Sequence, residues 1–330
     1  MPADPKLAHL SGDLAAEVPL IACRFDPAGK FVFATAENRS IYRWELTGGK
    51  RAAFTAHDSW VFDLAVTPDG QTLISAGGDD QLLWWSAAAP AESAPVRAVK
   101  AHTGWIRALA LSPDGKWLAS GGNDRIVRLW KVADGEKVRE FAGAERDIYS
   151  LAFHPAGQWL LAGDLDGKIR QWSIADGALV RTFDAGALHT YEGGQQVHYG
   201  GVRSLAFSFD AKWLIGGGLH KGTNPLGNVQ EPLALRFEWE TGKIARQHVT
   251  EGNPNERIWT LYGHAQGFLI AAIGGLKGAL LFWNEGEDKP FHNFPLPKSA
   301  RGMSVHSDGI QIATTHHDGK LRLTRLAAKA

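Results

Sequence analysis

Histidine, serine, aspartate and tryptophan recur at the same spacing in two stretches of the chain. The two sets are His57, Ser75, Asp79 and Trp85, and His102, Ser120, Asp124 and Trp130. Such histidines could take part in catalysis or bind a metal. However, an imidazole between a carboxylate and a hydroxyl, with an indole N–H donating to that hydroxyl, satisfies several buried polar groups at once. We therefore interpret both sets as hydrogen-bonded networks that specify the fold, and not as reactive centres.

Three further histidines lie close together in the sequence: His189, His198 and His220. Three imidazoles could form an open zinc site. Their spacing is irregular, however, and no carboxylate or thiol joins them in a recognisable motif. The adjacent His316 and His317 are expected to point apart. We therefore predict no metal site.

The sequence also lacks the motifs of common catalytic sites. It contains no Gly-x-Ser-x-Gly nucleophile elbow, no phosphate-binding loop of the Walker type and no Cys-x-x-Cys-His haem attachment. We therefore predict a protein without catalytic residues and without a cofactor.

The composition excludes several classes of protein. The chain has 330 residues, with 35 basic and 35 acidic side chains, whereas proteins that bind nucleic acid by neutralising phosphates usually carry a basic excess. Its single cysteine, Cys23, excludes an internal disulfide framework and multi-cysteine metal clusters. No apolar run approaches the ~20 residues that cross a bilayer, and we see no export signal. We expect a soluble, cytoplasmic monomer that binds neither nucleic acid nor membrane.

Glycine (38 residues) and tryptophan (13 residues) are both frequent, which suggests a structural position that is filled repeatedly. Six tryptophans end an apolar run at intervals of 41, 45, 42, 67 and 44 residues: Trp44, Trp85, Trp130, Trp172, Trp239 and Trp283. A similar segment without the tryptophan ends at Thr324. A turn marker similar to Pro113-Asp-Gly115 accompanies each copy. The chain therefore contains seven repeats.

Each repeat predicts four short strands. In the third repeat, apolar and β-branched runs separated by turn residues predict strands at Ile106–Leu111, Trp117–Ser120, Ile126–Trp130 and Lys137–Phe141. No stretch of ten or more residues keeps a helical period without a turn signal. Four antiparallel strands in ~42 residues form one blade of a β-propeller. We predict an all-β fold, a seven-bladed β-propeller of four-stranded antiparallel blades.

The third repeat resembles a WD repeat. Its segment Ser120-Gly-Gly-Asn-Asp124, followed by Trp130, is similar to the second half of that repeat, and Ala101-His102 is similar to its Gly-His half. The family's tetrad of His, Ser or Thr, Asp and Trp is complete in the two sets named above. The other repeats keep parts of it: Asn38 and Trp44; Asp166 and Trp172; His198 and Trp239; Trp283; and Thr314 and Asp318.

The resemblance extends over nearly the whole chain and implies a single WD-repeat propeller domain over residues 1–330. In WD propellers the start of the chain commonly supplies the outer strand of the last blade. We expect the segment Lys6–Leu10 to do so here, because pairing the two ends of the chain removes two exposed sheet edges.

The long interval before Trp239 contains two insertions, at about 184–200 and 219–232. Both are rich in Gly, Asn, Gln and Pro and poor in large apolar residues, so we predict loops. Long loops on a rigid scaffold often carry recognition, but a surface turn also tolerates insertion without any function. The sequence leaves both alternatives open.

Aromatic and arginine side chains recur near the start of the first strand of the repeats. They are Trp60, Phe62, Trp105, Arg107, Tyr149, Arg203, Arg257, Trp259 and Arg301. Core positions are expected to alternate with them along each strand, and aromatic residues with arginine are typical of interface hot spots. WD propellers use the narrow face around the central channel for partners, so the resemblance implies that these residues form a partner-binding face.

We therefore predict a non-catalytic scaffold for protein–protein interaction. Clustered arginines favour a partner with carboxylates or phosphates, and our hypothesis is an acidic, aromatic peptide segment of another protein. The aromatic residues could instead plug the channel mouth or pack on a neighbouring blade, and the arginines could pair with Glu37 or Asp147. An alternative function is a propeller enzyme with a metal or small ligand in the central channel, which would need carboxylates or asparagines on the inner strands. A third is self-association through the side surfaces of the blades.

Overall fold

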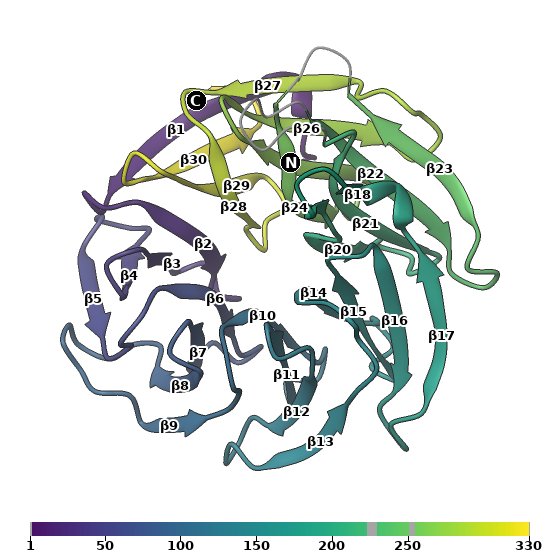
Figure 1. Ribbon diagram of the computed structural model, residues 1–330. Helices are drawn as coiled ribbons and strands as arrows, with labels where there is room; N and C mark the ends of the chain where they lie inside the picture. Colours follow the sequence, from purple (N-terminus) through teal and green to yellow (C-terminus); the bar gives the residue numbers. More distant parts are fainter. Residues whose placement is uncertain (1, 223–229, 251–254, 330) are drawn as a thin grey trace. The chain divides into compact units, whose positions relative to one another are not determined.

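The computed structural model describes residues 2–222, 230–250 and 255–329. These residues form seven four-stranded antiparallel sheets, which are the blades of a seven-bladed β-propeller (Figure 1). The fold predicted from the sequence is therefore confirmed. In the described part of the chain the helices are two 3-10 turns of three residues each, η1 (Pro5–Leu7) and η2 (Gly186–Leu188), and no helix is long and apolar enough to span a membrane.

Six blades consist of four consecutive strands each. The first three are β2 (Leu20–Phe25), β3 (Phe31–Ala36), β4 (Ser40–Glu45) and β5 (Arg51–Thr55); β6 (Val61–Val66), β7 (Thr72–Gly77), β8 (Gln81–Ser86) and β9 (Arg97–Lys100); and β10 (Ile106–Leu111), β11 (Trp117–Gly122), β12 (Val127–Lys131) and β13 (Lys137–Phe141). The next three are β14 (Ile148–Phe153), β15 (Trp159–Asp164), β16 (Lys168–Ser173) and β17 (Leu179–Asp184); β20 (Ser204–Phe207), β21 (Trp213–His220), β22 (Glu231–Glu238) and β23 (Ile244–Val249); and β24 (Arg257–Gly263), β25 (Phe268–Gly274), β26 (Gly278–Asn284) and β27 (His292–Leu296).

The chain forms two compact units. The second unit contains Arg125–Val127 and Glu140–Ala300, and the first unit contains the remainder. The blades β2–β5 and β6–β9 lie in the first unit together with most of β10–β13 and of the seventh blade. The blades β14–β17, β20–β23 and β24–β27 lie in the second unit.

The turns between strands follow from local sequence. After β10, the Ser112 hydroxyl donates to Asp114 Oδ1 (2.6 Å), and the same oxygen accepts from the Lys116 N–H (3.1 Å). Gly115 then adopts a φ of 70°, which glycine tolerates without steric cost. Of the four predicted strands in this blade, β10 and β13 have the predicted bounds, β11 ends two residues later and β12 is shifted by one residue.

The core lies between neighbouring sheets. Ile106, Leu118 and Trp130 of the third blade pack in one cluster with Leu82 and Trp84 of the second, and none of the five side chains is more than 3% exposed. The buried Trp84 indole N–H donates to the Val132 carbonyl at 3.1 Å, so the large ring is accommodated without an unpaired donor.

The seventh blade contains both ends of the chain. Its sheet has the order β1-β30-β29-β28, made from β28 (Ala300–Val305), β29 (Gln311–His316), β30 (Lys320–Leu326) and β1 (Ala8–Ala15). The prediction that the N-terminal segment supplies the outer strand is therefore confirmed. The strand begins two residues later than Lys6 and runs to Ala15, because Pro5–Leu7 form η1.

The insertion at 184–200 is not the loop that the sequence predicted. It contains η2 and a hairpin of β18 (His189–Glu192) and β19 (Val197–Gly200). The second insertion partly lengthens the β21–β22 hairpin, where Leu219 pairs with Pro232 and His220 with Glu231. Residues 223–229 of the predicted loop lie outside the described residues. The sequence did not predict β18 and β19 because each has only four residues and the segment is rich in Gly and Gln, which are typical of loops.

Removal of β1 tests the closure of the seventh blade. Deleting residues 1–15 exposes the edge of β30 and uncovers Leu321, against which Leu14 packs. We expect the melting temperature, measured by circular dichroism, to fall by at least ~5 °C. The control Lys6→Ala changes an exposed side chain outside the strand and should leave the melting temperature within ~1 °C. A deletion that melts like the full chain would contradict a stabilising role for β1.

Candidate functional site

The second blade contains a complete hydrogen-bonded tetrad. The Trp85 indole N–H donates to Ser75 Oγ at 2.9 Å, and this oxygen lies 2.8 Å from His57 Nε2. On the other side of the ring, His57 Nδ1 lies 2.9 Å from Asp79 Oδ2. Because a carboxylate only accepts, Nδ1 is the donor to Asp79, which leaves Nε2 to accept from the serine O–H. Every polar atom of the hydroxyl and the ring is therefore used within the network.

The third blade repeats this network and adds a positive charge. The Trp130 N–H donates to Ser120 Oγ at 2.8 Å, His102 bridges Ser120 (2.7 Å) and Asp124 (3.0 Å), and Arg128 Nη1 donates to Asp124 Oδ2 at 2.6 Å. Burial raises the pKa of the Asp124 carboxyl, but hydrogen bonds and charges from His102 and Arg128 outweigh burial and hold that pKa well below its usual range. Ser75 and Ser120 have no exposed surface, so neither hydroxyl can reach a substrate as a nucleophile.

The tetrads also fix the loops that lead into the first strands. Asp79 Oδ2 accepts from the Asp58 backbone N–H at 2.9 Å, and the Gly78 N–H donates to the Trp60 carbonyl at 2.8 Å. In the third blade, a Cβ on Gly122 would lie only 1.8 Å from the Trp105 carbonyl oxygen. The backbone of both tryptophans is therefore held against the turn that carries the tetrad aspartate.

In other blades, the aspartate at the position of Asp79 accepts hydrogen bonds from residues other than a tetrad histidine. In the seventh blade, Asp318 accepts two hydrogen bonds from Arg322, at 2.9 and 2.6 Å. The predicted hydroxyl, Thr314, lies 2.8 Å from His316 Nε2. As expected, His316 is buried whereas the adjacent His317 is exposed. The sequence did not predict this hydrogen bond between Thr314 and His316, which lies at the end of β29.

The aspartate of the fourth blade, Asp166, faces two histidines of the inserted hairpin. His198 does not occupy the structural histidine position of the fifth repeat, so that assignment is wrong: it lies on β19 and, with His189 of β18, faces Asp166. A carboxylate therefore does join two of the three histidines, contrary to the expectation from the sequence. His220 lies at the end of β21, with Nε2 3.2 Å from Glu231 Oε2.

In the first unit, four residues of the predicted face form one aromatic and cationic cluster. Trp60 and Trp105 are 46% and 44% exposed. The Phe62 ring lies between them, with centroids 6.4 Å from Trp60 and 5.3 Å from Trp105. The Arg107 guanidinium lies over Trp105 (5.1 Å) and Phe62 (5.7 Å), and its Nε donates to Asn123 Oδ1 at 2.5 Å. We call Trp60, Phe62, Trp105 and Arg107 the indole cluster.

A β-bulge interrupts several first strands at the second predicted position. In the first unit the register shifts around Phe62 and Arg107, and in the second unit around Tyr149 and Trp259. The predicted strict alternation is therefore wrong at these points: Phe62 and Asp63 both lie outside the core, whereas Val61 and Leu64 are fully buried. A bulge inserts an unpaired residue and re-aims its side chain, and a sequence pattern with period two cannot show it.

The predicted residues of the second unit form two separate pairs. The Arg203 guanidinium lies 3.8 Å from the Tyr149 ring centroid, and Arg257 lies 5.4 Å from that of Trp259. All four side chains are partly buried. In the first unit, Arg301 forms an ion pair with Glu37, which the sequence had left open as an alternative to partner binding.

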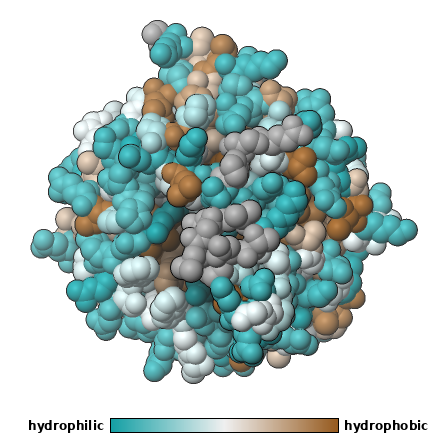
Figure 2. Space-filling view, turned by 45° about the horizontal axis from the view of Figure 1, so that its top comes forward, coloured by the Kyte–Doolittle hydropathy of each residue, from teal (hydrophilic) through white to brown (hydrophobic). Residues whose placement is uncertain are grey.

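The second unit contains two cavities, both near the turns that follow the first strands and not near the strand starts where the predicted residues lie. One has a volume of about 390 Å³ and is lined by turn residues and aromatic rings, among them Trp159, Trp213 and Trp239. The other has about 20 Å³, room for about one water. The predicted residues line neither of these two cavities. On the face drawn in Figure 2, hydrophobic residues lie in small separate patches among hydrophilic ones.

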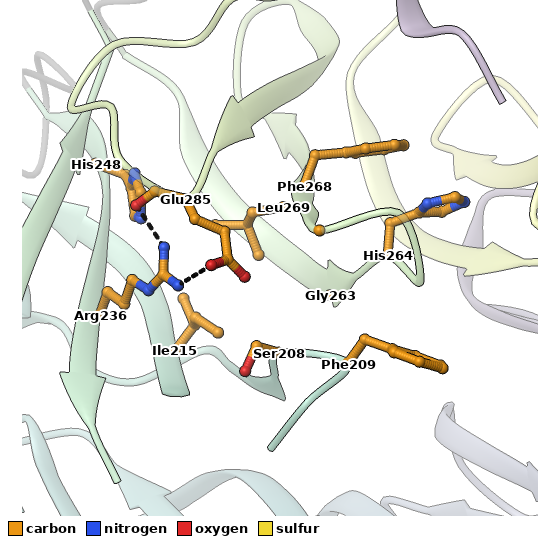
Figure 3. A pocket seen from close by; sticks show the side chains of 11 residues that line it. Ser208, Phe209, Ile215, Arg236, His248, Gly263, His264, Phe268, Leu269 and Glu285 are labelled. Atoms are coloured by element: carbon orange, nitrogen blue, oxygen red, sulfur yellow. Dashed lines mark hydrogen bonds and ion pairs between the residues drawn. The ribbon is translucent and has the colours of Figure 1, made fainter. Parts of the chain in front are cut away.

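The smaller cavity lies beside an ion pair between the buried Arg236 and the exposed Glu285. Figure 3 shows Arg236 pointing toward Glu285, with Nη2 2.9 Å from Oε2, and His248 beside them. His248 is 1% exposed, and its Nδ1 donates to the Glu287 carbonyl at 2.8 Å. Burial, together with the nearby charge of Arg236 and Arg246, lowers the pKa of His248 to about 4. The imidazole is therefore neutral near pH 7.

Four segments of the chain match a protein family described as WD domain, G-beta repeat: residues 48–86, 93–131, 135–173 and 188–222. Each of the first three matches starts close to the outer strand of one blade and ends with the third strand of the next. One curated protein, nuclear distribution protein nudF 2 of Talaromyces marneffei, is 33% identical over 79 residues. That match covers 24% of this chain and 16% of the fungal protein, so the chain spans well under two thirds of that relative.

Truncation of a tetrad serine tests its role. Ser120→Ala leaves His102 Nε2 and the Trp130 N–H without their buried partner, so we expect the free energy of unfolding to fall by about 2–4 kcal/mol. Urea denaturation measures this change. Ser86→Ala, at an exposed position, is the matched control and should stay within ~0.5 kcal/mol. Adding Trp130→Phe to Ser120→Ala removes one unpaired donor and should recover part of the loss. A loss no larger than that of the control would contradict a stabilising network.

The buried His248 predicts a pH dependence of stability. Its pKa is about 4 in the folded chain against 6.5 when exposed, so the unfolded chain binds the proton first as the pH falls. The neutral His248 therefore contributes fully to the free energy of unfolding above about pH 6.5. As the pH falls toward 4, this free energy decreases by about 3 kcal/mol. His248→Gln should remove this part of the decline when unfolding free energies are compared at pH 7 and pH 4.5. Parallel pH profiles for both proteins would show that His248 does not contribute.

Proposed function

The chain belongs to the WD-repeat propeller family, and from this we propose that it is a non-catalytic scaffold that binds another protein through the indole cluster. WD40 propellers generally act as non-enzymatic scaffolds for protein–protein interaction. We further propose that residues 1–330 act as one domain, as a monomer in the cytoplasm. The partner is a protein segment and not a nucleic acid or a membrane.

The proposal rests mainly on Trp60 and Trp105, whose indole rings are exposed while their backbone is held in place. Trp60 and Trp105 each directly precede a residue with no exposed surface, Val61 and Ile106. Their backbone carbonyls are held by the N–H groups of Gly78 and Asn123. A large ring on an immobile backbone loses little conformational entropy when a partner covers it, which is why tryptophan is enriched at interface hot spots.

The chemistry of the cluster supports an acidic, aromatic partner segment. The Phe62 and Trp105 rings provide an apolar surface on which an aromatic side chain of the partner can pack. Arg107 is oriented by Asn123 beside the same rings, so that a carboxylate of the partner can approach the guanidinium. Arg203 and Arg257, each against an aromatic ring, present the same combination in the second unit. Arg301 forms an ion pair with Glu37, with which a carboxylate of the partner would have to compete.

The enzyme alternative has less support. Among the described residues, the group of His, Cys, Asp and Glu side chains that could hold a metal is Asp166 with His189 and His198, and none of the three lies on the first strand of a blade. The single thiol, Cys23, is buried, and its burial raises the pKa to about 12. A thiol with this pKa stays protonated and is a poor nucleophile.

A peptide-display experiment tests the proposed surface. Random 12-residue peptides are selected on the immobilised full chain, and we expect enrichment of sequences that combine Asp or Glu with aromatic residues. The best peptide should bind Trp105→Ala and Arg107→Ala at least ~10-fold more weakly than the unmodified chain, measured by fluorescence anisotropy.

Phe209→Ala serves as the control, because Phe209 is 72% exposed and lies in a turn after β20, away from the starts of the first strands. This variant should bind the peptide within ~2-fold of the unmodified chain. Enrichment of basic peptides, or equal binding by the indole-cluster variants and the unmodified chain, would contradict the proposal.

A further inference from the structure

The inserted hairpin of the second unit places two imidazoles on the same face. His189 is the first residue of β18, and His198 is the second residue of β19. The register pairs His189 with Gly200 and Tyr191 with His198, so the two histidines are diagonal neighbours across the hairpin, and such neighbours share a face. The Tyr191 ring packs on His198, with centroids 4.7 Å apart.

A carboxylate from the fourth blade completes a group of three. His189 Nε2 and His198 Nδ1 share a hydrogen bond of 2.9 Å, which a metal ion would replace, and Asp166 Oδ1 lies 3.7 Å from the first nitrogen and 3.6 Å from the second. A triangle with these sides has a circumradius of about 2.0 Å, which is the length of a Zn–N or Zn–O bond in proteins. One point can therefore lie at bonding distance from all three atoms.

The two oxygens of Asp166 differ in their hydrogen bonding. Arg146 Nε lies 3.2 Å from the other oxygen, Oδ2, and orients the carboxylate. Oδ1 is buried and has no hydrogen-bond partner, and the two imidazole nitrogens are too far from it for hydrogen bonds. A buried carboxylate oxygen without a partner is costly, and a cation between the three atoms would remove that cost.

The hairpin is anchored, so the three atoms are held before a ligand arrives. Leu188, which precedes His189, has no exposed surface. The Ala185 N–H donates to the Gly167 carbonyl, next to Asp166, at 2.8 Å, and after the hairpin the Val202 N–H donates to the Asp164 carbonyl at 3.0 Å. Both ends of the insertion are thus attached close to the carboxylate. Such pre-organisation reduces the entropy lost on binding.

We propose that Asp166, His189 and His198 bind a zinc ion, with a fourth coordination position open to water or to a ligand from another molecule. Two imidazoles and one carboxylate form a donor set typical of zinc sites with an open position. The three separations of 2.9, 3.6 and 3.7 Å average about 3.4 Å, and ligand atoms around tetrahedral zinc are about 3.3–3.4 Å apart. The three side chains are 19–26% exposed, which leaves the open position accessible.

Arg146 sets a limit on the affinity. Its Nη2 lies 3.4 Å from His198 Nε2, which carries the proton when Nδ1 binds a metal, so this contact has to loosen on binding. The guanidinium charge also opposes that of the cation. We therefore expect Arg146→Gln to bind zinc at least as tightly as the unmodified chain.

Zinc titration of the full chain, without a histidine tag and stripped of metal, tests the site. In competition with a chromophoric chelator, we expect one zinc per chain. His189→Ala, His198→Ala and Asp166→Asn should each weaken binding at least ~10-fold. His220→Ala, in the second insertion, is the matched control and should bind within ~2-fold. Cobalt should give the strong visible absorption of a four-coordinate ion, and this absorption should disappear in the three variants.

The outcomes separate this site from ordinary surface histidines. Absence of saturable zinc binding by the unmodified chain would overturn the proposal, as would binding that survives in all three ligand variants or is lost in His220→Ala. If an alanine variant does not fold, judged by circular dichroism, His189→Gln and His198→Gln replace it. In addition, zinc should raise the melting temperature of the unmodified chain but not that of Asp166→Asn, and an equal rise in both would contradict the site.

Discussion

An aspartate in the turn between the second and third strands of a blade needs a hydrogen-bond donor or a positive charge, and the blades meet this need in different ways. In the second blade His57 bonds both to Asp79 and to the buried hydroxyl of Ser75. Because His57 and Trp60 belong to the same short loop, the network that satisfies the carboxylate also fixes the exposed indole. The hydrogen bonding of a carboxylate beneath the surface thereby determines where the Trp60 side chain lies on the surface.

The fourth blade lacks the structural histidine, and its aspartate is only partly satisfied. Arg146 reaches one oxygen of Asp166, and the second oxygen faces two imidazoles from an insertion into the next repeat. In the seventh blade the equivalent Asp318 is satisfied on both oxygens by Arg322. The same position of the repeat thus serves the fold in most blades where it is an aspartate, and in one blade it becomes available for ligand chemistry.

Much of the fold could be predicted because its signals are local. Turn residues such as Gly115 and the apolar runs beside them determine strand bounds, and two strands of the third blade have the predicted limits. The β18–β19 hairpin was missed because each strand has only four residues and the connecting Gly and Gln residues are typical of loops. The β-bulges at Phe62 and Arg107 were missed because they depend on the pairing of strands and not on residue type.

The candidate surface was predictable in composition but not in its contacts. Recurrence near the start of the first strands identified Trp60 and Trp105. The pairing of Arg301 with Glu37 and the contact between the Phe62 and Trp105 rings, in contrast, depend on neighbouring blades. His198 was misassigned for a similar reason, since its carboxylate partner lies 32 residues away, in the preceding repeat.

Oxidative footprinting of individual tryptophans tests the central claim most directly, namely that the buried networks hold two indoles at the surface for a partner to cover. Trp60 and Trp105 should oxidise rapidly in the free chain while Trp85 and Trp130, which are 1% and 3% exposed, should not. A bound partner protein should then protect both exposed indoles. Equal oxidation of all four rings, or unchanged oxidation of Trp60 and Trp105 in the complex, would contradict that claim.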